Sequence, residues 1–184
     1  TGQRPEPVDL VLLEDGRPDP AVLAERQVVH RGNGEEPETL DPHRAVGVPA
    51  AHILRDLFEG LTAESLEGRI VPGAAMRWNI SRDGKTYTFH LREGIKFHDG
   101  SDLTAEDIVF SYERVPNVPN SPSSFATYTA GIAEITVVDD YTIQFRTNGP
   151  YPLLPIDLST IQIVSSENPD ATTEDYNAGT ASIG

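Results

Sequence analysis

The stretch that decides the fold is residues 83–92, which read Asp-Gly-Lys-Thr-Tyr-Thr-Phe-His-Leu-Arg. From Thr86 onward polar and apolar residues alternate strictly, so that Tyr87, Phe89 and Leu91 share one face. This alternation predicts a β-strand with one buried face, because successive side chains of a strand point to opposite sides. Asp83-Gly84 is a turn signal, and an apolar segment with Trp78 lies before it, so the stretch predicts a β-hairpin.

Working outward, the same pattern predicts further strands. Residues 135–137 and 141–145 alternate around a turn at Asp139-Asp140, which predicts a second hairpin. Residues 95–97 precede a turn at 98–100 and are expected to form a short strand. Residues 161–164 form a last apolar piece, followed by a polar tail over 165–184, whose last residues, 177–184, are not expected to be the end of a helix.

Two helices are predicted from their ends. Thr104 and Asp107 resemble a capping box, and the helix that they begin is expected to stop before Pro116. A second helix is expected over 49–59, with a proline in its first turn and Gly60 as a left-handed cap after its end. The order of hairpins and helices predicts a mixed α/β fold.

Composition narrows the class of protein. The 184 residues contain 14 Lys and Arg against 29 Asp and Glu, a formal net charge of −15, and 38% are hydrophobic. This supply of apolar residues suffices for a core, whereas the scarcity of basic residues argues against nucleic-acid binding. The absence of cysteine excludes disulfides, thiolate metal sites and cysteine nucleophiles. No apolar run approaches the roughly 20 residues that cross a bilayer.

Catalytic motifs give weak signals. The five histidines lack the spacing of a helical metal site, and a structural role is the favoured interpretation of His90 and His98. Neither a phosphate-binding glycine loop nor a Gly-x-Ser-x-Gly motif occurs, and a pair of distant catalytic carboxylates stays open. Phe125 and Tyr128 follow a loop rich in proline and serine, where they could line a binding groove or anchor the loop on the core.

Taken together, a series of motifs in register resembles the amino-terminal part of the periplasmic oligopeptide- and dipeptide-binding proteins, the solute-binding proteins of ATP-driven importers. The resemblance covers residues 27 to about 165 and is closest to the oligopeptide branch. The motifs are Leu40-Asp41-Pro42-His43, Gly47-Val48-Pro49, Leu57-Phe58-Glu59-Gly60-Leu61, Pro72-Gly73-Ala74, Trp78, residues 83–92, Phe97-His98-Asp99-Gly100 and Leu103-Thr104-Ala105-Glu106-Asp107.

The resemblance implies a protein about three times this length, with two lobes that close around a peptide. Residues 1–26 would be an extended arm, 27–58 the start of lobe one, and 59–184 an inserted α/β subdomain with a mixed sheet, flanking helices and hairpins. The remainder and the second lobe would be absent, so that the chain is an amino-terminal piece. No cofactor and no metal are implied.

The resemblance also implies a ligand site at Val46, Gly47, Val48, Phe125 and Tyr128. In the family the valine at position 48 binds the peptide main chain, and an aromatic residue at position 125 packs on the ligand; Phe125 keeps the ring without the hydroxyl. Val46 replaces an acidic residue of the family pattern, which argues against a preference for basic side chains. The groups that hold the two peptide termini would lie in the absent lobe, so we expect the piece alone to bind peptide weakly or not at all.

The function thus implied is a periplasmic receptor that delivers oligopeptides to inner-membrane permease subunits and performs no catalysis. It would contact the membrane only through the permease and would bind no nucleic acid. Two alternatives remain: a receptor of the same fold for a sugar, haem or metal complex, and a hydrolase that uses carboxylates or the region of His90 and His98.

Overall fold

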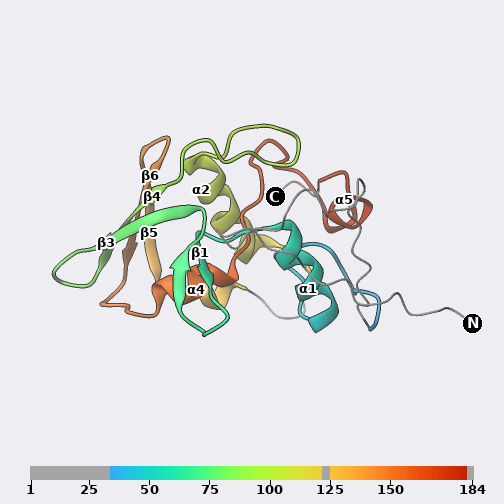
Figure 1. Ribbon diagram of the computed structural model, residues 1–184, viewed down its shortest axis with the longest axis horizontal. Helices are drawn as coiled ribbons and strands as arrows, with labels where there is room; N and C mark the ends of the chain where they lie inside the picture. The colour runs from blue at the N-terminus through green and yellow to red at the C-terminus, as the bar shows by residue number, and fades with distance from the viewer. Residues whose placement is uncertain (1–33, 122–124, 182–184) are drawn as a thin grey trace, which may run out of the picture. The chain divides into compact units, whose positions relative to one another are not determined.

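The computed structural model describes residues 34–121 and 125–181. The extended arm expected at 1–26 lies outside the described residues. The described elements run as follows (Figure 1): α1 Val48–Leu57, β1 Thr62–Glu64, β2 Ile70–Pro72, β3 Ala75–Ile80, β4 Thr86–Leu91, α2 Ala105–Arg114, a 3-10 turn η2 Val115–Asn117, α3 Ala126–Thr129, β5 Ile132–Asp139, β6 Thr142–Thr147, α4 Leu154–Thr160 and α5 Thr173–Ala178.

The main sheet confirms both predicted hairpins. Its strands are antiparallel in the order β3-β4-β6-β5, so that the two hairpins lie side by side through β4 and β6. Gly84 has φ +69° in the turn between β3 and β4, a conformation that favours glycine. Phe89 pairs with Trp78 on one side and with Ile143 on the other, which places all three on the same face.

That face is the core of the molecule's described part. Phe89, Phe145 and Tyr112 of α2 meet in edge-to-face contacts, with ring centroids 5.6 Å and 5.3 Å apart. Helix α2 therefore covers the apolar face of the sheet (Figure 1), while the opposite face carries partly exposed polar residues such as Thr88 and Gln144. One covered face and one polar face are typical of antiparallel sheets. The mixed fold of helices and sheets is as predicted.

Helix α2 begins at the predicted capping box. The Asp107 carboxylate accepts hydrogen bonds from the Thr104 N–H at 2.8 Å and from the Thr104 hydroxyl at 3.1 Å. Its other oxygen accepts from the N–H and the hydroxyl of Ser166, both at 2.8 Å. The cap therefore also ties the start of α2 to the segment that follows α4.

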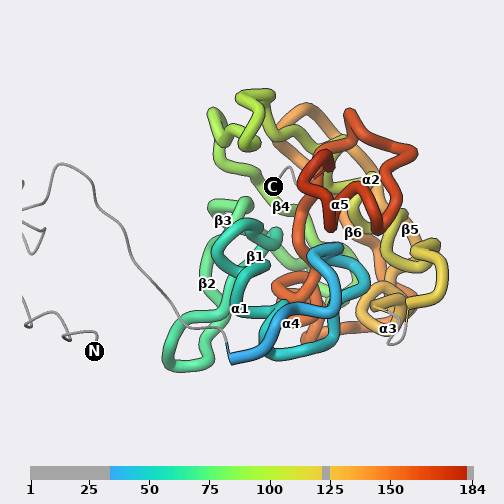
Figure 2. The backbone as a smooth tube through the Cα atoms, turned by 90° about the vertical axis from the view of Figure 1, so that its right-hand side faces the viewer, coloured from blue at the N-terminus to red at the C-terminus, as the bar shows by residue number. Residues whose placement is uncertain are grey.

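A smaller layer carries the candidate site. Strands β1 and β2 form a two-stranded antiparallel sheet, against which α4 packs. Figure 2 shows α3 next to α4. Helix α1 packs in a second, smaller core with α5, to which Leu54, Phe58, Val164 and Tyr176 contribute.

Three local predictions were wrong. Helix α1 ends at Leu57, and its cap is Phe58 with an extended backbone; Gly60 instead lies where the backbone passes so closely that a β-carbon would be 2.9 Å from the Thr62 carbonyl oxygen. Residues 95–97 form no strand, apart from an isolated bridge at Lys96. The polar tail contains α5, which ends at a left-handed Gly179 with φ +75°.

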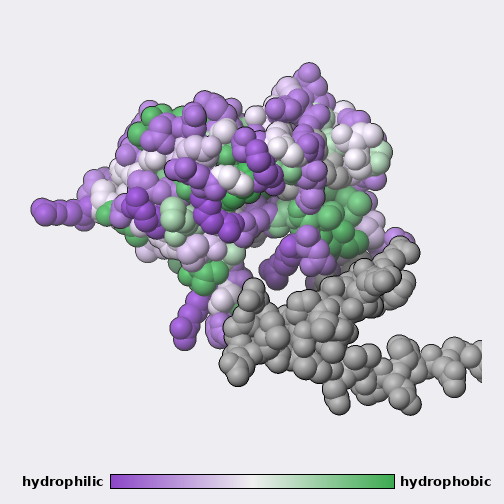
Figure 3. Space-filling model, turned by 45° about the horizontal axis from the view of Figure 1, so that its top comes forward, coloured by the Kyte–Doolittle hydropathy of each residue, from purple (hydrophilic) through white to green (hydrophobic). Residues whose placement is uncertain are grey.

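The surface reflects the composition. The face drawn in Figure 3 is mostly hydrophilic, with small separate hydrophobic areas. Large apolar side chains that are exposed include Val46 and Val48, next to the start of α1, and Leu66 in the turn between β1 and β2. No described helix is long and apolar enough to span a membrane.

Candidate functional site

The start of α1 presents an exposed piece of backbone. Gly47 is the residue before the helix, with an extended backbone and no side chain to cap it, and the first turn contains no acidic residue. Val48 is 67% exposed and Val46 is 53% exposed. Pro49 has no N–H, and the Val48 N–H has no hydrogen-bond partner within the described residues. A main-chain donor of an exposed residue, without a partner among the residues that the structure describes, therefore lies where the resemblance implies a ligand.

Glu38 holds this segment from outside the helix. One carboxylate oxygen of Glu38, Oε1, accepts hydrogen bonds from the N–H groups of Val46 and Gly47, both at 2.8 Å. These bonds, led by that from Val46, lower the pKa of Glu38 below its ordinary value. The carboxylate also lies over the α-carbon of Gly47, where a β-carbon would come within 2.7 Å of Oε2. No sequence pattern points to Glu38, because it lies in an irregular segment.

Phe125 and Tyr128 lie together at the start of α3. Their ring centroids are 5.9 Å apart, and the Tyr128 N–H donates to the Phe125 carbonyl at 2.9 Å. Both rings are partly buried and pack against the main core, so they do anchor this segment. Anchoring leaves part of each ring accessible, and contact with a ligand stays a proposal.

A cavity of about 390 Å³ lies between α1, β1 and the end of α4. Its lining contains Phe125 and also Ala45 and Ala51, which flank the exposed segment at the start of α1. Of the five predicted site residues only Phe125 lines it; Val46, Gly47, Val48 and Tyr128 do not. The cavity thus brings Phe125 together with Ala45, just before that segment, and with Ala51, one turn into α1.

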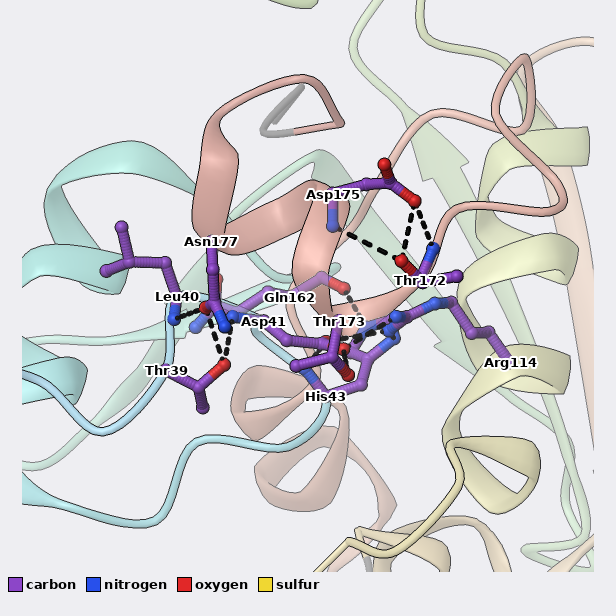
Figure 4. Close-up of polar contacts among 10 residues, drawn as sticks. All are labelled: Thr39, Leu40, Asp41, His43, Arg114, Gln162, Thr172, Thr173, Asp175 and Asn177. Carbon is purple, nitrogen blue, oxygen red and sulfur yellow. Dashed lines mark hydrogen bonds and ion pairs between the residues drawn. The ribbon is translucent and has the colours of Figure 1, made fainter.

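A buried ion pair fixes the chain just before this segment (Figure 4). Asp41 is fully buried and accepts two hydrogen bonds from the Arg114 guanidinium, at 2.8 Å and 2.7 Å. Burial alone would raise the pKa of Asp41, but the hydrogen bonds and charge of Arg114 outweigh it and lower the pKa. Removing either Asp41 or Arg114 would leave the other as an unpaired buried charge, which would destabilise the fold.

His43 completes this cluster as a neutral side chain. Arg114 has only donors, and its NH1 lies 3.0 Å from His43 Nδ1, so Nδ1 must accept. The proton is therefore on Nε2, which donates to the Gln162 carbonyl at 2.7 Å. Burial, reinforced by the positive charge of Arg114, lowers the pKa of His43 to about 4. This is a satisfied structural histidine, and its neutral state is set by its neighbours.

Helix α5 closes the cluster from the carboxyl-terminal side. The Thr173 hydroxyl donates to Asp41 at 2.8 Å, and the Tyr176 ring lies beneath the Arg114 guanidinium, 4.5 Å from centroid to carbon. Asn177 accepts from the Thr39 hydroxyl at 2.8 Å and from the Leu40 N–H at 2.7 Å (Figure 4). Arg114 and helix α5, which are far from residues 39–43 in the sequence, therefore fix the position of that segment. Residues 39–43 lead directly into Val46–Val48, so this segment is positioned as well.

Other chemistry finds little support in the described part of the chain. No group of His, Cys, Asp and Glu residues there could hold a metal ion. His90 lies on the polar face of β4, where its Nε2 is 3.4 Å from Asn79 Nδ2, and His98 lies in a turn, as the sequence predicted.

Comparisons with known proteins agree on the family. The model for bacterial extracellular solute-binding proteins, family 5 (middle) matches residues 69–184. The periplasmic oligopeptide-binding protein OppA of Escherichia coli K12 is 40% identical over 159 residues, which cover 77% of this chain and 29% of that protein. A probable deoxycholate-binding periplasmic protein of the same organism, YgiS, is 39% identical over 147 residues, covering 71% of this chain and 27% of that protein.

Among solved structures, OppA of Haemophilus influenzae in complex with the peptide RPPGFSPFR has a TM-score of 0.74 and 27% sequence identity; the match covers 83% of this chain and 33% of that one. The chain thus spans about a third or less of the length of each of these proteins. Since the family model covers more than half of the sequence, the chain belongs to family 5 of the bacterial extracellular solute-binding proteins.

Proposed function

We propose that this chain is part of a receptor that captures extended oligopeptides through their main chain for an ABC importer. The observation that carries the proposal is the N–H of Val48, a residue that is 67% exposed at the start of α1 and whose N–H has no hydrogen-bond partner within residues 34–121 and 125–181. A free main-chain donor can pair with a peptide carbonyl whatever the peptide's side chains are, as in strand addition. Such pairing suits a receptor for peptides of varied sequence.

The neighbouring features fit the same ligand. The cavity beside α1 contains both polar and apolar groups, among them Phe125, Ser159 and Thr160, so it offers a hydrated pocket for a side chain. Phe125 and Tyr128 would place partly exposed aromatic rings beside the peptide. Val48 would supply its main-chain N–H, with Val46 and Gly47 beside it in the same segment.

The relatives support a periplasmic location and a role in transport for this protein. OppA is named as a periplasmic oligopeptide-binding protein, and we propose the same compartment and a delivery role to inner-membrane permease subunits for this protein. Within it, residues 27–58 would begin lobe one and residues 59–184 would form the inserted subdomain. The proposal includes no catalytic step, no cofactor and no nucleic acid.

Isothermal titration of the protein expressed from its complete gene tests the proposal. We expect heat with tri- to pentapeptides of unrelated sequences, together with unchanged peptide masses after incubation. A Val48→Pro variant removes the N–H while keeping a residue that suits the first helical turn, and it should bind more weakly. A control variant, Leu66→Ala, which changes an exposed apolar residue in the turn between β1 and β2, should bind with unchanged affinity. Peptide cleavage, or no heat with any peptide, would reject the proposal.

A receptor of the same family for another solute is the second candidate. The observation that favours it is the relative named as probably deoxycholate-binding, whose identity of 39% is close to the 40% of OppA. A sugar, haem or metal complex belongs to the same alternative. Titration with deoxycholate and with these solutes, in parallel with the peptides, separates the two candidates by which one produces saturable heat.

A further inference from the structure

Glu38 has a position that the proposed function leaves unexplained. Its Oε1 atom accepts from two consecutive N–H groups, those of Val46 and Gly47, at the same distance of 2.8 Å. The side chain itself is exposed, and it forms no ion pair within the described residues. A surface carboxylate with two such hydrogen bonds fixes the backbone of Val46 and Gly47.

The helix behind this segment explains why an outside group is needed. Helices are commonly capped by a side chain at the residue before them and by acidic residues in the first turn. Here the residue before α1 is Gly47, and the first turn contains no acid. Glu38, which lies 8 residues before Val46 in the sequence, supplies the missing negative group at the positive end of α1.

The arrangement also determines which donor remains. Glu38 occupies the N–H groups of Val46 and Gly47, and Pro49 has none, so the Val48 N–H is left without a partner in the described structure. The Oε2 atom lies directly over Gly47, so that only glycine fits there without displacing the carboxylate. Two N–H groups are thus held and the next one is presented.

We propose that Glu38 is a positioning residue, which fixes the Val46–Val48 backbone in the conformation that pairs with a peptide. This inference rests on the proposed function. Without the acceptor, water replaces it at both exposed N–H groups, and the segment must be ordered anew each time a ligand binds. Ordering a single residue lowers affinity by roughly tenfold.

The test compares Glu38→Ala with Glu38→Gln in the complete protein, with trialanine as the neutral probe. The Gln side chain keeps a carbonyl oxygen that can accept the same two hydrogen bonds, but it removes the charge. We expect affinity about tenfold lower in Glu38→Ala and within about twofold of wild type in Glu38→Gln. Glu36→Ala is the matched control, because it removes an exposed acid from the same segment; its affinity should equal that of wild type.

Amide hydrogen exchange gives a readout that needs no ligand. Exchange at Val46 and Gly47 should quicken in Glu38→Ala and stay near wild type in Glu38→Gln, with melting temperatures within a few degrees of one another. Unchanged affinity in Glu38→Ala, or equal weakening in both Glu38 variants, would overturn the positioning role while leaving the proposed function intact. Failure of the wild-type protein to bind any peptide would overturn the proposed function and the positioning role with it.

Discussion

At the scale of single residues, His43 shows how neighbours set a protonation state. A second proton would have to enter at Nδ1, where Arg114 already donates, inside a fully buried cluster. Both burial and the Arg114 charge act in the same direction and lower the pKa of His43 from 6.5 to about 4. The unfolded chain therefore takes up a proton at a pH where the folded protein does not.

This difference makes stability depend on pH. Because the folded pKa is depressed, the contribution of neutral His43 is complete above pH 6.5 and is lost progressively as the pH falls toward 4. We expect the free energy of unfolding to fall by about 3 kcal/mol over this window from His43 alone, at about 1.4 kcal/mol per pH unit. Asp41, whose pKa is also lowered, changes stability in the same direction at lower pH.

Urea denaturation at several pH values between 7 and 4 measures this slope. In a His43→Gln variant, which is less stable at pH 7, the slope should become shallower. His52, exposed on α1, provides the control, and His52→Gln should keep the wild-type slope. An unchanged slope in His43→Gln would mean that other groups cause the pH dependence.

Gly47 tests the close approach of Glu38. Its φ of −89° suits any residue, so the backbone does not require glycine. A β-carbon there would nevertheless meet Glu38 Oε2 at 2.7 Å, and the flexible end of Glu38 would have to move. Gly47→Ala should therefore leave the melting temperature within a few degrees of wild type but weaken peptide binding several-fold, as titration calorimetry can measure. Wild-type affinity in Gly47→Ala would show that Glu38 adapts without consequence.

At the scale of elements, the capping boxes of α2 and α5 differ in what surrounds their acidic residue. Asp107 at α2 is buried and also accepts two hydrogen bonds from Ser166, whereas Asp175 at α5 bonds mainly within its own turn, to Thr172 and Thr180. Loss of an exposed cap costs about 1 kcal/mol, and each buried donor left unsatisfied adds about 1–3 kcal/mol.

We therefore expect Asp107→Ala to lower the free energy of unfolding by about 3 kcal/mol or more, and Asp175→Ala by about 1 kcal/mol. Urea denaturation of the two variants in the same buffer measures the difference. Equal losses would show that the contact with Ser166 contributes nothing beyond the cap itself.

The same elements show what sequence alone could predict. The two hairpins and α2 were predicted because their signals are local: alternation, a turn and a capping box. Helix α5 was missed because it is short and polar, and its Thr173, Tyr176 and Asn177 are explained only by residues from the other end of the chain. The Asp41-Pro42-His43 motif was recognised as a family pattern, but its partner Arg114 is 73 residues from Asp41. No local pattern encodes such a pairing.

At the scale of the whole molecule, the proposed division at residue 58 raises the question of whether the chain is flexible there. The backbone around it is held on several sides: the Phe58 N–H donates to Leu54, the Glu59 carbonyl accepts from Ile163 at 2.9 Å, and the Gly60 carbonyl accepts from Ala74 at 3.0 Å. Phe58 is itself buried in the core that joins α1 to α5. A protease needs an exposed and unfolded segment, which this is not.

Leu66 offers the comparison within the same protein, because it lies fully exposed in the turn between β1 and β2. Brief treatment with chymotrypsin, followed by mass spectrometry, should show cleavage after Leu66 well before any cleavage after Phe58. Leu66→Gln should abolish the early cut without affecting the melting temperature, since the side chain has no packing to lose. Early cleavage at Phe58 would instead mean that the proposed border between lobe one and the inserted subdomain opens easily, in which case the cluster around Asp41 and Arg114 does not hold the two parts together.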